Sequence, residues 1–106
     1  MANKKTIVID IDGVLCSEEK THERVFATPI KQAITYINEL VECGHTVILF
    51  TARSWAEFKI TYSWLINNGV RFHSLVCGKP CGDFYVDDRS FRSMSELIDK
   101  IPFLLI

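Results

Sequence analysis

The stretch TIVIDIDG, residues 6–13, decides the fold that we expect for this chain. Its first half is a compact run of β-branched side chains, which is typical of a buried strand in a parallel sheet. Two aspartates, Asp10 and Asp12, lie at the end of this run, and Gly13 follows them. Because side chains alternate along a strand, both carboxylates should project from the same side and converge on one ligand.

The same order of elements recurs along the chain. Short apolar runs alternate with helix-length amphipathic segments, which favours βαβ units and a small parallel sheet with both faces covered. We therefore predict a Rossmann-like α/β fold, a three-layer sandwich formed by one domain over residues 1–106. The expected strands are residues 6–11, 46–50, 71–76 and 84–86.

Three helices are expected between and after these strands, each with a recognisable start or stop. Thr28 as N-cap and Pro29 as first residue begin a helix that Gly44 ends. Ser54 with Glu57 forms a capping-box pattern, and Asn67-Asn68-Gly69 stops the helix that it opens. Ser93 with Glu96 suggests a third capped helix, which Pro102 closes.

Composition excludes several classes of function. The chain has 106 residues, 48% hydrophobic and 24% charged, with a formal net charge of −1 at pH 7. That balance provides no basic field for nucleic acid or an anionic membrane. The N-terminus lacks the long apolar region of a signal peptide, so we expect a cytoplasmic protein whose four cysteines are reduced.

Polar residues follow each predicted strand at its carboxyl end. Thr51 follows the second strand, Lys79 the third, and Asp87 with Asp88 the fourth. Open parallel sheets bind ligands at this edge, so the two acidic pairs should meet there. Four adjacent carboxylates would repel one another unless a hard cation such as Mg²⁺ neutralised them.

This set of residues suits phosphoryl transfer. The ion would take up developing charge, Thr51 and Lys79 would bind phosphate oxygens, and Gly13 would let the turn backbone approach an anion. One aspartate of the first pair could attack phosphorus, while the other protonates the leaving oxygen and later activates water.

The motifs Asp10-Ile11-Asp12-Gly13-Val14, Thr51-Ala52-Arg53, Lys79-Pro80 and Asp87-Asp88 resemble the four ordered motifs of the haloacid dehalogenase superfamily, in its phosphatase branch. The resemblance implies Asp10 as nucleophile and Asp12 as acid/base, with the Asp12 carbonyl also on the metal. It implies Thr51 and Lys79 as phosphate ligands and Asp87, with Asp88, as magnesium ligands. Ala52 and Arg53, next to Thr51, are further candidates for binding the substrate or its phosphate.

The chain is also similar to small uncapped members of that superfamily called capsular polysaccharide biosynthesis phosphatases, through short strings such as Gly78-Lys79-Pro80. This resemblance implies a phosphorylated sugar or related metabolite as substrate. The sequence departs from the family's pattern at two positions, and both concern how the substrate fits. Val14 stands where threonine is commoner, and Ser54-Trp55 follows Arg53 where glycine is expected.

Neither of the usual positions for a cap domain has room for one. Residues 15–28 alone separate the first motif from the first helix, and Lys79 follows closely on residue 76. We therefore expect an open site, or one whose wall a second subunit supplies. The apolar tail, residues 103–106, suits such a contact, which is the basis for expecting a homo-oligomer.

Other interpretations of single residues stay open. Cys77 and Cys81 with a nearby histidine could bind zinc, although their spacing fits no common finger. Trp55, just past the phosphate loop, could form a platform for a ring of the substrate. A phospho-receiver or phosphate-binding domain of similar fold is the alternative function, although a receiver has its acidic pair before the acceptor aspartate rather than last.

Overall fold

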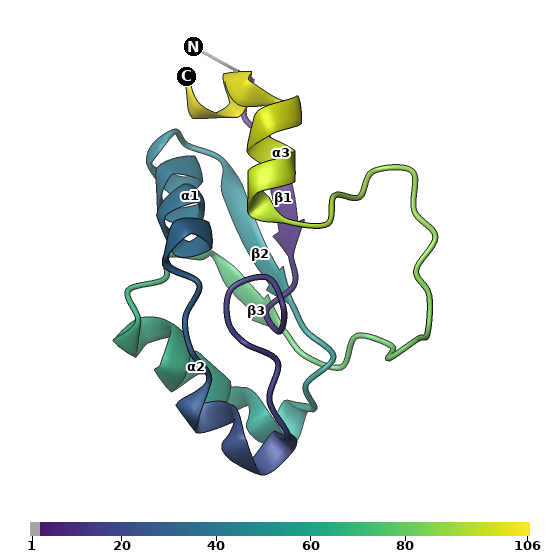
Figure 1. The fold of residues 1–106 in the computed structure, drawn as a ribbon. Helices are drawn as coiled ribbons and strands as arrows, with labels where there is room; N and C mark the ends of the chain where they lie inside the picture. The colour runs from purple at the N-terminus through teal and green to yellow at the C-terminus, as the bar shows by residue number, and fades with distance from the viewer. Residues whose placement is uncertain (1–2) are drawn as a thin grey trace.

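A computed structural model describes residues 3–106, and its ribbon is a small three-stranded sheet packed against helices (Figure 1). The order of elements along the chain is β1 (Thr6–Ile9), η1 (Thr21–Phe26), α1 (Lys31–Glu42), β2 (Thr46–Phe50), η2 (Trp55–Glu57), α2 (Phe58–Asn67), β3 (Ser74–Val76), α3 (Met94–Lys100) and η3 (Pro102–Leu105).

All three strands are parallel, in the spatial order β1-β2-β3. The register pairs Thr6 with Thr46 and Ile9 with Leu49, and Phe50 with Val76. The carboxyl ends of the strands consequently lie at one edge of the sheet, which is where the sequence predicts the site residues.

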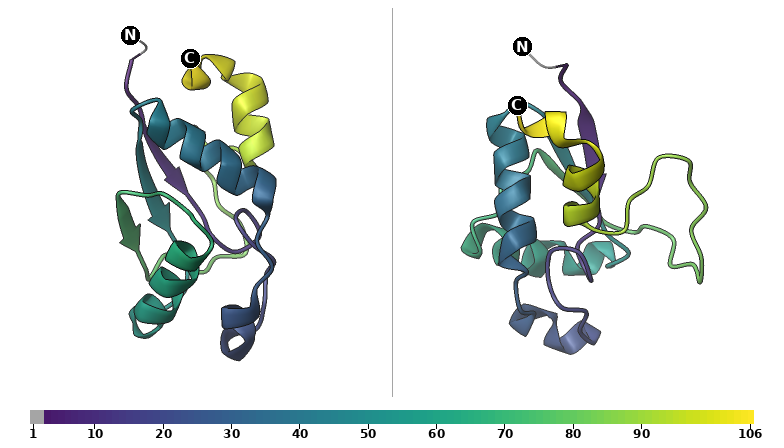
Figure 2. Two further views of the ribbon diagram at one scale, coloured as in Figure 1. Left: turned by 90° about the vertical axis from the view of Figure 1, so that its left-hand side faces the viewer. Right: turned by 45° about the horizontal axis from the view of Figure 1, so that its top comes forward.

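One face of the sheet carries the core. Ile9, Val47, Leu49 and Leu75 are buried in a single cluster with the apolar faces of α1, α2 and α3. Figure 2 shows α1 and α3 side by side on this face. On the opposite face Val8 is 57% exposed. The described residues therefore form two layers, where the sequence predicted a three-layer sandwich.

Several predicted boundaries are confirmed. β2 has the predicted bounds, Thr46–Phe50. The amide of Ser54 donates to Glu57 Oε2 at 3.0 Å, as the capping box requires, and the amide of Glu96 donates to Ser93 Oγ at 3.1 Å. α1 ends before Gly44, whose φ of +90° is the left-handed conformation that favours glycine.

Other boundaries differ from the prediction. α1 begins at Lys31, not at Pro29, because Thr28 and Ser17 bind each other through two hydrogen bonds that hold this segment extended. β1 and β3 are shorter than expected, at Thr6–Ile9 and Ser74–Val76.

The largest correction concerns residues 84–86, which do not form a strand. Phe84 and Val86 are 90% and 100% exposed, in a loop that projects from the body of the molecule (Figure 1). Within the described residues β1 is paired on one edge only, by β2. A run of β-branched and aromatic residues forms a strand only when it pairs with the edge of a sheet, and residues 84–86 pair with none of the described strands.

The C-terminal segment is held by a buried histidine. His45 is 1% exposed; its Nδ1 accepts from the Lys5 amide at 3.0 Å and its Nε2 lies 2.7 Å from the carbonyl oxygen of Leu104. Leu104 is buried, whereas Phe103 and Ile106 are exposed. The apolar tail therefore packs in part against its own chain. Between residues 3 and 106 no helix has the length and apolar character to cross a bilayer.

Candidate active site

Asp10 lies at the end of β1 beside the predicted phosphate lysine. Its Oδ2 is 3.7 Å from Lys79 Nζ, and its Oδ1 accepts a hydrogen bond from the Ile11 amide at 2.8 Å. The Asp10 side chain is 38% exposed, so a solvent-borne ligand can reach it. The structure thus brings together a carboxylate of the first motif and the ammonium of the third.

Lys79 is positioned by aromatic rings as well as by charge. Its Nζ lies 4.5 Å from the centre of the Tyr85 ring and 5.8 Å from that of Phe50. The Tyr85 hydroxyl donates to the Pro80 carbonyl at 2.8 Å and accepts from the Gly82 amide at 3.0 Å. Tyr85 therefore folds the chain after Lys79 back over the ammonium. Sequence reasoning did not single out Tyr85, because this contact depends on the loop's path.

Asp12 is bound to Arg53 by two parallel hydrogen bonds. Arg53 Nε donates to Asp12 Oδ2 at 2.9 Å, and Arg53 Nη2 donates to Asp12 Oδ1 at 2.7 Å. Arg53 is 1% exposed and the Asp12 side chain 15%. Burial alone would lower the pKa of Arg53, but the hydrogen bonds and charge of Asp12 outweigh it and raise that pKa.

The loops after β2 and β3 are joined through their backbones. The Lys79 amide donates to the Thr51 carbonyl at 2.9 Å, and the Gly78 amide donates to the Arg53 carbonyl at 2.8 Å. Thr51 is fully buried, and its hydroxyl accepts from the Arg53 amide at 3.1 Å, whereas Ala52 between them is exposed. In this arrangement Thr51 organises the loop, and the Ala52 position faces solvent.

Gly13 forms the turn that follows the acidic pair. Its φ of +82° favours glycine, and its amide donates to the Cys16 carbonyl at 2.9 Å. The amides of Val14 and Leu15 both donate to the Ile11 carbonyl. The turn is thus closed on itself, and the Gly13 amide is already used inside the protein.

The second acidic pair is not at the site. Asp87 and Asp88 are exposed in the loop after Lys79, where Asp87 Oδ1 accepts from the Arg89 amide at 2.9 Å. Among residues 3–106, no three acidic, cysteine or histidine side chains come close enough to hold a metal ion. The expected convergence of four carboxylates is therefore absent from this part of the chain, because the segment that would deliver two of them is not paired with β1.

Cys16 and Thr61 complete the surroundings of Asp12, and no sequence motif marks either residue. Cys16 Sγ lies 3.8 Å from Asp12 Oδ1 and 3.9 Å from Arg53 Nη2. Burial, reinforced by the charge of Asp12, raises the pKa of the Cys16 thiol to about 12, so this thiol is inert at neutral pH. Thr61, in the first turns of α2, accepts from Arg53 Nη1 at 3.1 Å.

The zinc interpretation finds no support in the described residues. Cys77 is buried, Cys81 is exposed in the loop, and all four cysteines are free thiols. Burial raises the pKa of Cys77. His45, which precedes β2, has a structural partner on each ring nitrogen, as described above, and His73 Nδ1 accepts from the Val47 amide at 3.0 Å. The cysteines therefore need no metal to explain their positions.

Trp55 has the position that made it a candidate platform. It is 59% exposed, lies against Gly78 and stacks on Phe58, with ring centres 5.8 Å apart. Phe58 in turn stacks on Tyr62 at 5.9 Å. An aromatic surface thus begins beside the lysine loop and continues along α2.

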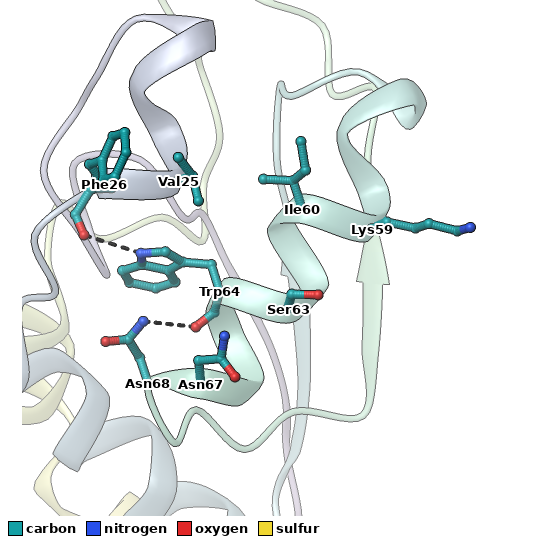
Figure 3. A pocket seen from close by; sticks show the side chains of 9 residues that line it. Val25, Phe26, Lys59, Ile60, Ser63, Trp64, Asn67 and Asn68 are labelled. Carbon is teal, nitrogen blue, oxygen red and sulfur yellow. Dashed lines mark hydrogen bonds between the residues drawn. The ribbon is translucent and has the colours of Figure 1, made fainter.

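Two surface pockets lie away from Asp10, Asp12 and Lys79. One, of about 500 Å³, is lined by apolar and polar side chains from residues 25–27 and from α2 and its C-cap (Figure 3). There Trp64 Nε1 donates to the Ala27 carbonyl at 3.1 Å, and Asn68 Nδ2 donates to the Trp64 carbonyl at 2.8 Å. The other, of about 620 Å³, lies between α2 and β3. Neither pocket is lined by Asp10, Asp12 or Lys79, which are at an open edge.

Comparison with known proteins shows a shared fold. No family model and no curated protein matches the chain. A structural-genomics target from Vibrio cholerae is similar in structure, with a TM-score of 0.77 and 26% identity over 95% of this chain and 96% of that one. A chain of the Pnkp1/Rnl/Hen1 complex is also similar, with a TM-score of 0.64 and 17% identity, over 95% of this chain and 37% of that one.

Proposed function

We propose that this protein is a magnesium-dependent phosphomonoester hydrolase that passes a phosphoryl group through Asp10. The observation that supports it most is the meeting of Asp10, the Asp12–Arg53 pair and Lys79 at the carboxyl edge of one parallel sheet. The proposed nucleophile and acid/base follow β1, the proposed phosphate cation follows β3, and Arg53, which binds Asp12, follows β2.

In the first step proposed, a carboxylate oxygen of Asp10 attacks phosphorus as the bond from phosphorus to the leaving oxygen breaks. Asp12 gives a proton to that oxygen, and an aspartyl phosphate and an alcohol result. In the second step Asp12 takes a proton from water, whose oxygen attacks phosphorus and releases inorganic phosphate and the Asp10 carboxylate. Lys79 neutralises part of the phosphate charge in both steps.

The described residues do not fit a complete Mg²⁺ site in the arrangement shown, since Asp87 and Asp88 stand apart from Asp10. A hard cation prefers several oxygen ligands, and one exposed carboxylate supplies too few. Our proposal of Mg²⁺ therefore includes movement of the loop that carries Asp87 and Asp88 toward the end of β1. The unpaired edge of β1 and the exposed residues 84–86 are what such a movement would bring together.

We further propose that the chain belongs to the haloacid dehalogenase superfamily, as an uncapped phosphatase with a sugar phosphate or related metabolite as substrate. The order of the four motifs supports this proposal, and so does the open edge at Asp10, because no described segment covers it. A second copy of the chain remains the proposed source of any further wall.

The direct test is release of phosphate from p-nitrophenyl phosphate in the presence and absence of Mg²⁺. We expect turnover that needs the metal and is lost in Asp10→Asn. The matched control is Asp99→Asn, which changes an exposed aspartate of α3 and should leave turnover intact. No release by the wild-type protein above a boiled sample would contradict the proposal.

One observation favours the alternative, a domain that binds phosphate without hydrolysing it. Both carboxylate oxygens of Asp12 are held by Arg53, so proton transfer must proceed through their remaining lone pairs. Binding of inorganic phosphate to the wild-type protein, measured by calorimetry, with no turnover of any phosphomonoester would establish that alternative.

A further inference from the structure

We infer that Arg53 is a positioning residue that fixes the carboxylate of Asp12, and that Thr61 holds Arg53 in place from α2. This inference rests on the proposed function, because a fixed Asp12 matters only if Asp12 moves protons. It differs from the sequence expectation, which placed Arg53 against the phosphate.

The first observation is that each of the three nitrogens of the Arg53 guanidinium donates a hydrogen bond inside the protein. Nε and Nη2 bind the two oxygens of Asp12, and Nη1 binds Thr61 Oγ1 at 3.1 Å. Arg53 is 1% exposed. A phosphate could contact this group only by displacing bonds that are shielded from water, so the geometry disfavours Arg53 as a phosphate ligand.

The second observation is the two-point grip on Asp12. Two parallel bonds from a planar guanidinium fix the plane of a carboxylate as well as its position. A lysine could not do so, because an ammonium is a point charge without this fork. An acid/base group acts efficiently only when it is held within reach of the oxygen that gains or loses the proton.

The third observation connects the grip to the helix. Thr61 is 1% exposed and lies in α2, whose start is held by the bond between Ser54 and Glu57. The chain of contacts runs from α2 through Thr61 and Arg53 to Asp12. Cys16 lies against the same carboxylate, with its Sγ 3.8 Å from Asp12 Oδ1.

The test compares Arg53→Lys and Thr61→Val with two matched controls, Arg71→Lys and Thr35→Val, in turnover of p-nitrophenyl phosphate with Mg²⁺. Arg71 bonds the exposed Glu42, and Thr35 bonds a carbonyl within α1, so both controls repeat the chemistry away from the site. Misplacing a catalytic group by an ångström costs up to about a hundredfold in rate. We expect kcat to fall about a hundredfold in Arg53→Lys and about tenfold in Thr61→Val, with KM within about threefold of wild type.

Rescue distinguishes positioning from a general effect on folding. Millimolar guanidinium added to Arg53→Gly should restore part of kcat without lowering KM, and it should do nothing for Asp10→Asn. A rise in KM at unchanged kcat in Arg53→Lys would overturn the inference and make Arg53 a phosphate ligand. Equal kcat in Thr61→Val and Thr35→Val would also overturn it, and this comparison decides if the arginine variants do not fold.

A readout without turnover separates this inference from the proposed function. The Nε proton of Arg53, followed by NMR, should exchange slowly with water in the wild-type protein and faster in Thr61→Val. If the wild type hydrolyses nothing while this proton is protected, the proposed function fails and the grip on Asp12 stands. Rapid exchange in the wild type would overturn the grip itself.

Discussion

The two acidic pairs of this chain have similar sequences and opposite structural settings. Asp10 and Asp12 follow a strand that is paired with β2, and their neighbours hold them by hydrogen bonds. Asp87 and Asp88 follow an exposed apolar run that pairs with no strand in the described residues. The difference teaches that strand pairing, more than the motif, positions a carboxylate.

The largest expected difference between the two regions is in the reactivity of their cysteine thiols. Cys16 contacts Asp12, and burial raises its pKa to about 12, whereas Cys81 is exposed in the loop. At about pH 8, alkylation of Cys16 should be on the order of a thousandfold slower than that of Cys81, since the thiolate is the reactive form. Mass spectrometry after iodoacetamide measures both rates in one sample, and urea should make them similar. Rapid labelling of Cys16 in the folded protein would contradict its setting.

A second effect concerns stability. Asp12→Ala leaves the buried Arg53 without its partner, so we expect the free energy of unfolding to fall by about 3–5 kcal/mol. Asp87→Ala removes an exposed side chain and should change it by less than about 0.5 kcal/mol. Urea unfolding of the two variants measures this contrast. Equal losses would show that Asp87 is as deeply built into the fold as Asp12.

The smallest effect is a pH dependence at the start of α2. Burial opposes ionisation of Glu57, but bonds from Arg24 and the Ser54 amide outweigh it, and the pKa of Glu57 is lowered from 4.5. Because the folded-state pKa lies below the unfolded one, this stabilisation is present above about pH 4.5 and is lost as the pH falls through the folded pKa. The contribution should be about 1 kcal/mol.

Comparison with Glu57→Gln isolates that contribution. The variant should lose less stability than the wild type when both are acidified, as measured by thermal unfolding across the acid range. Identical pH profiles for the two proteins would show that Glu57 ionisation does not support the helix start.

Local signals predicted much of the fold. The bounds of β2, the bond of Ser54 to Glu57 and the stop at Gly44 each depend on residues a few positions apart, so the sequence carries them directly. The meeting of Asp10 and Lys79 was predictable too, because parallel strands end at a common edge.

The rest depends on contacts between distant segments. Residues 84–86 have the composition of a strand, but composition does not decide whether this segment pairs with the edge of the sheet. Arginine is a residue type that often binds phosphate, but the partners of Arg53 here are Asp12 and Thr61, which are distant from one another in the sequence. The predicted helix start near Thr28 was wrong for the same reason, since the Thr28 backbone forms hydrogen bonds with Ser17, a residue outside the helix.

The central claim is that a phosphoryl group rests on Asp10, and trapping that group tests it most directly. The protein is incubated with Mg²⁺ and a phosphomonoester, quenched in acid and reduced with borohydride, which converts a phosphorylated aspartate into homoserine. Peptide mass spectrometry should place homoserine at Asp10 alone, with none in a sample lacking substrate. Unmodified Asp10 during measured turnover, or modification at Asp12 or Asp87 in its place, would contradict the account.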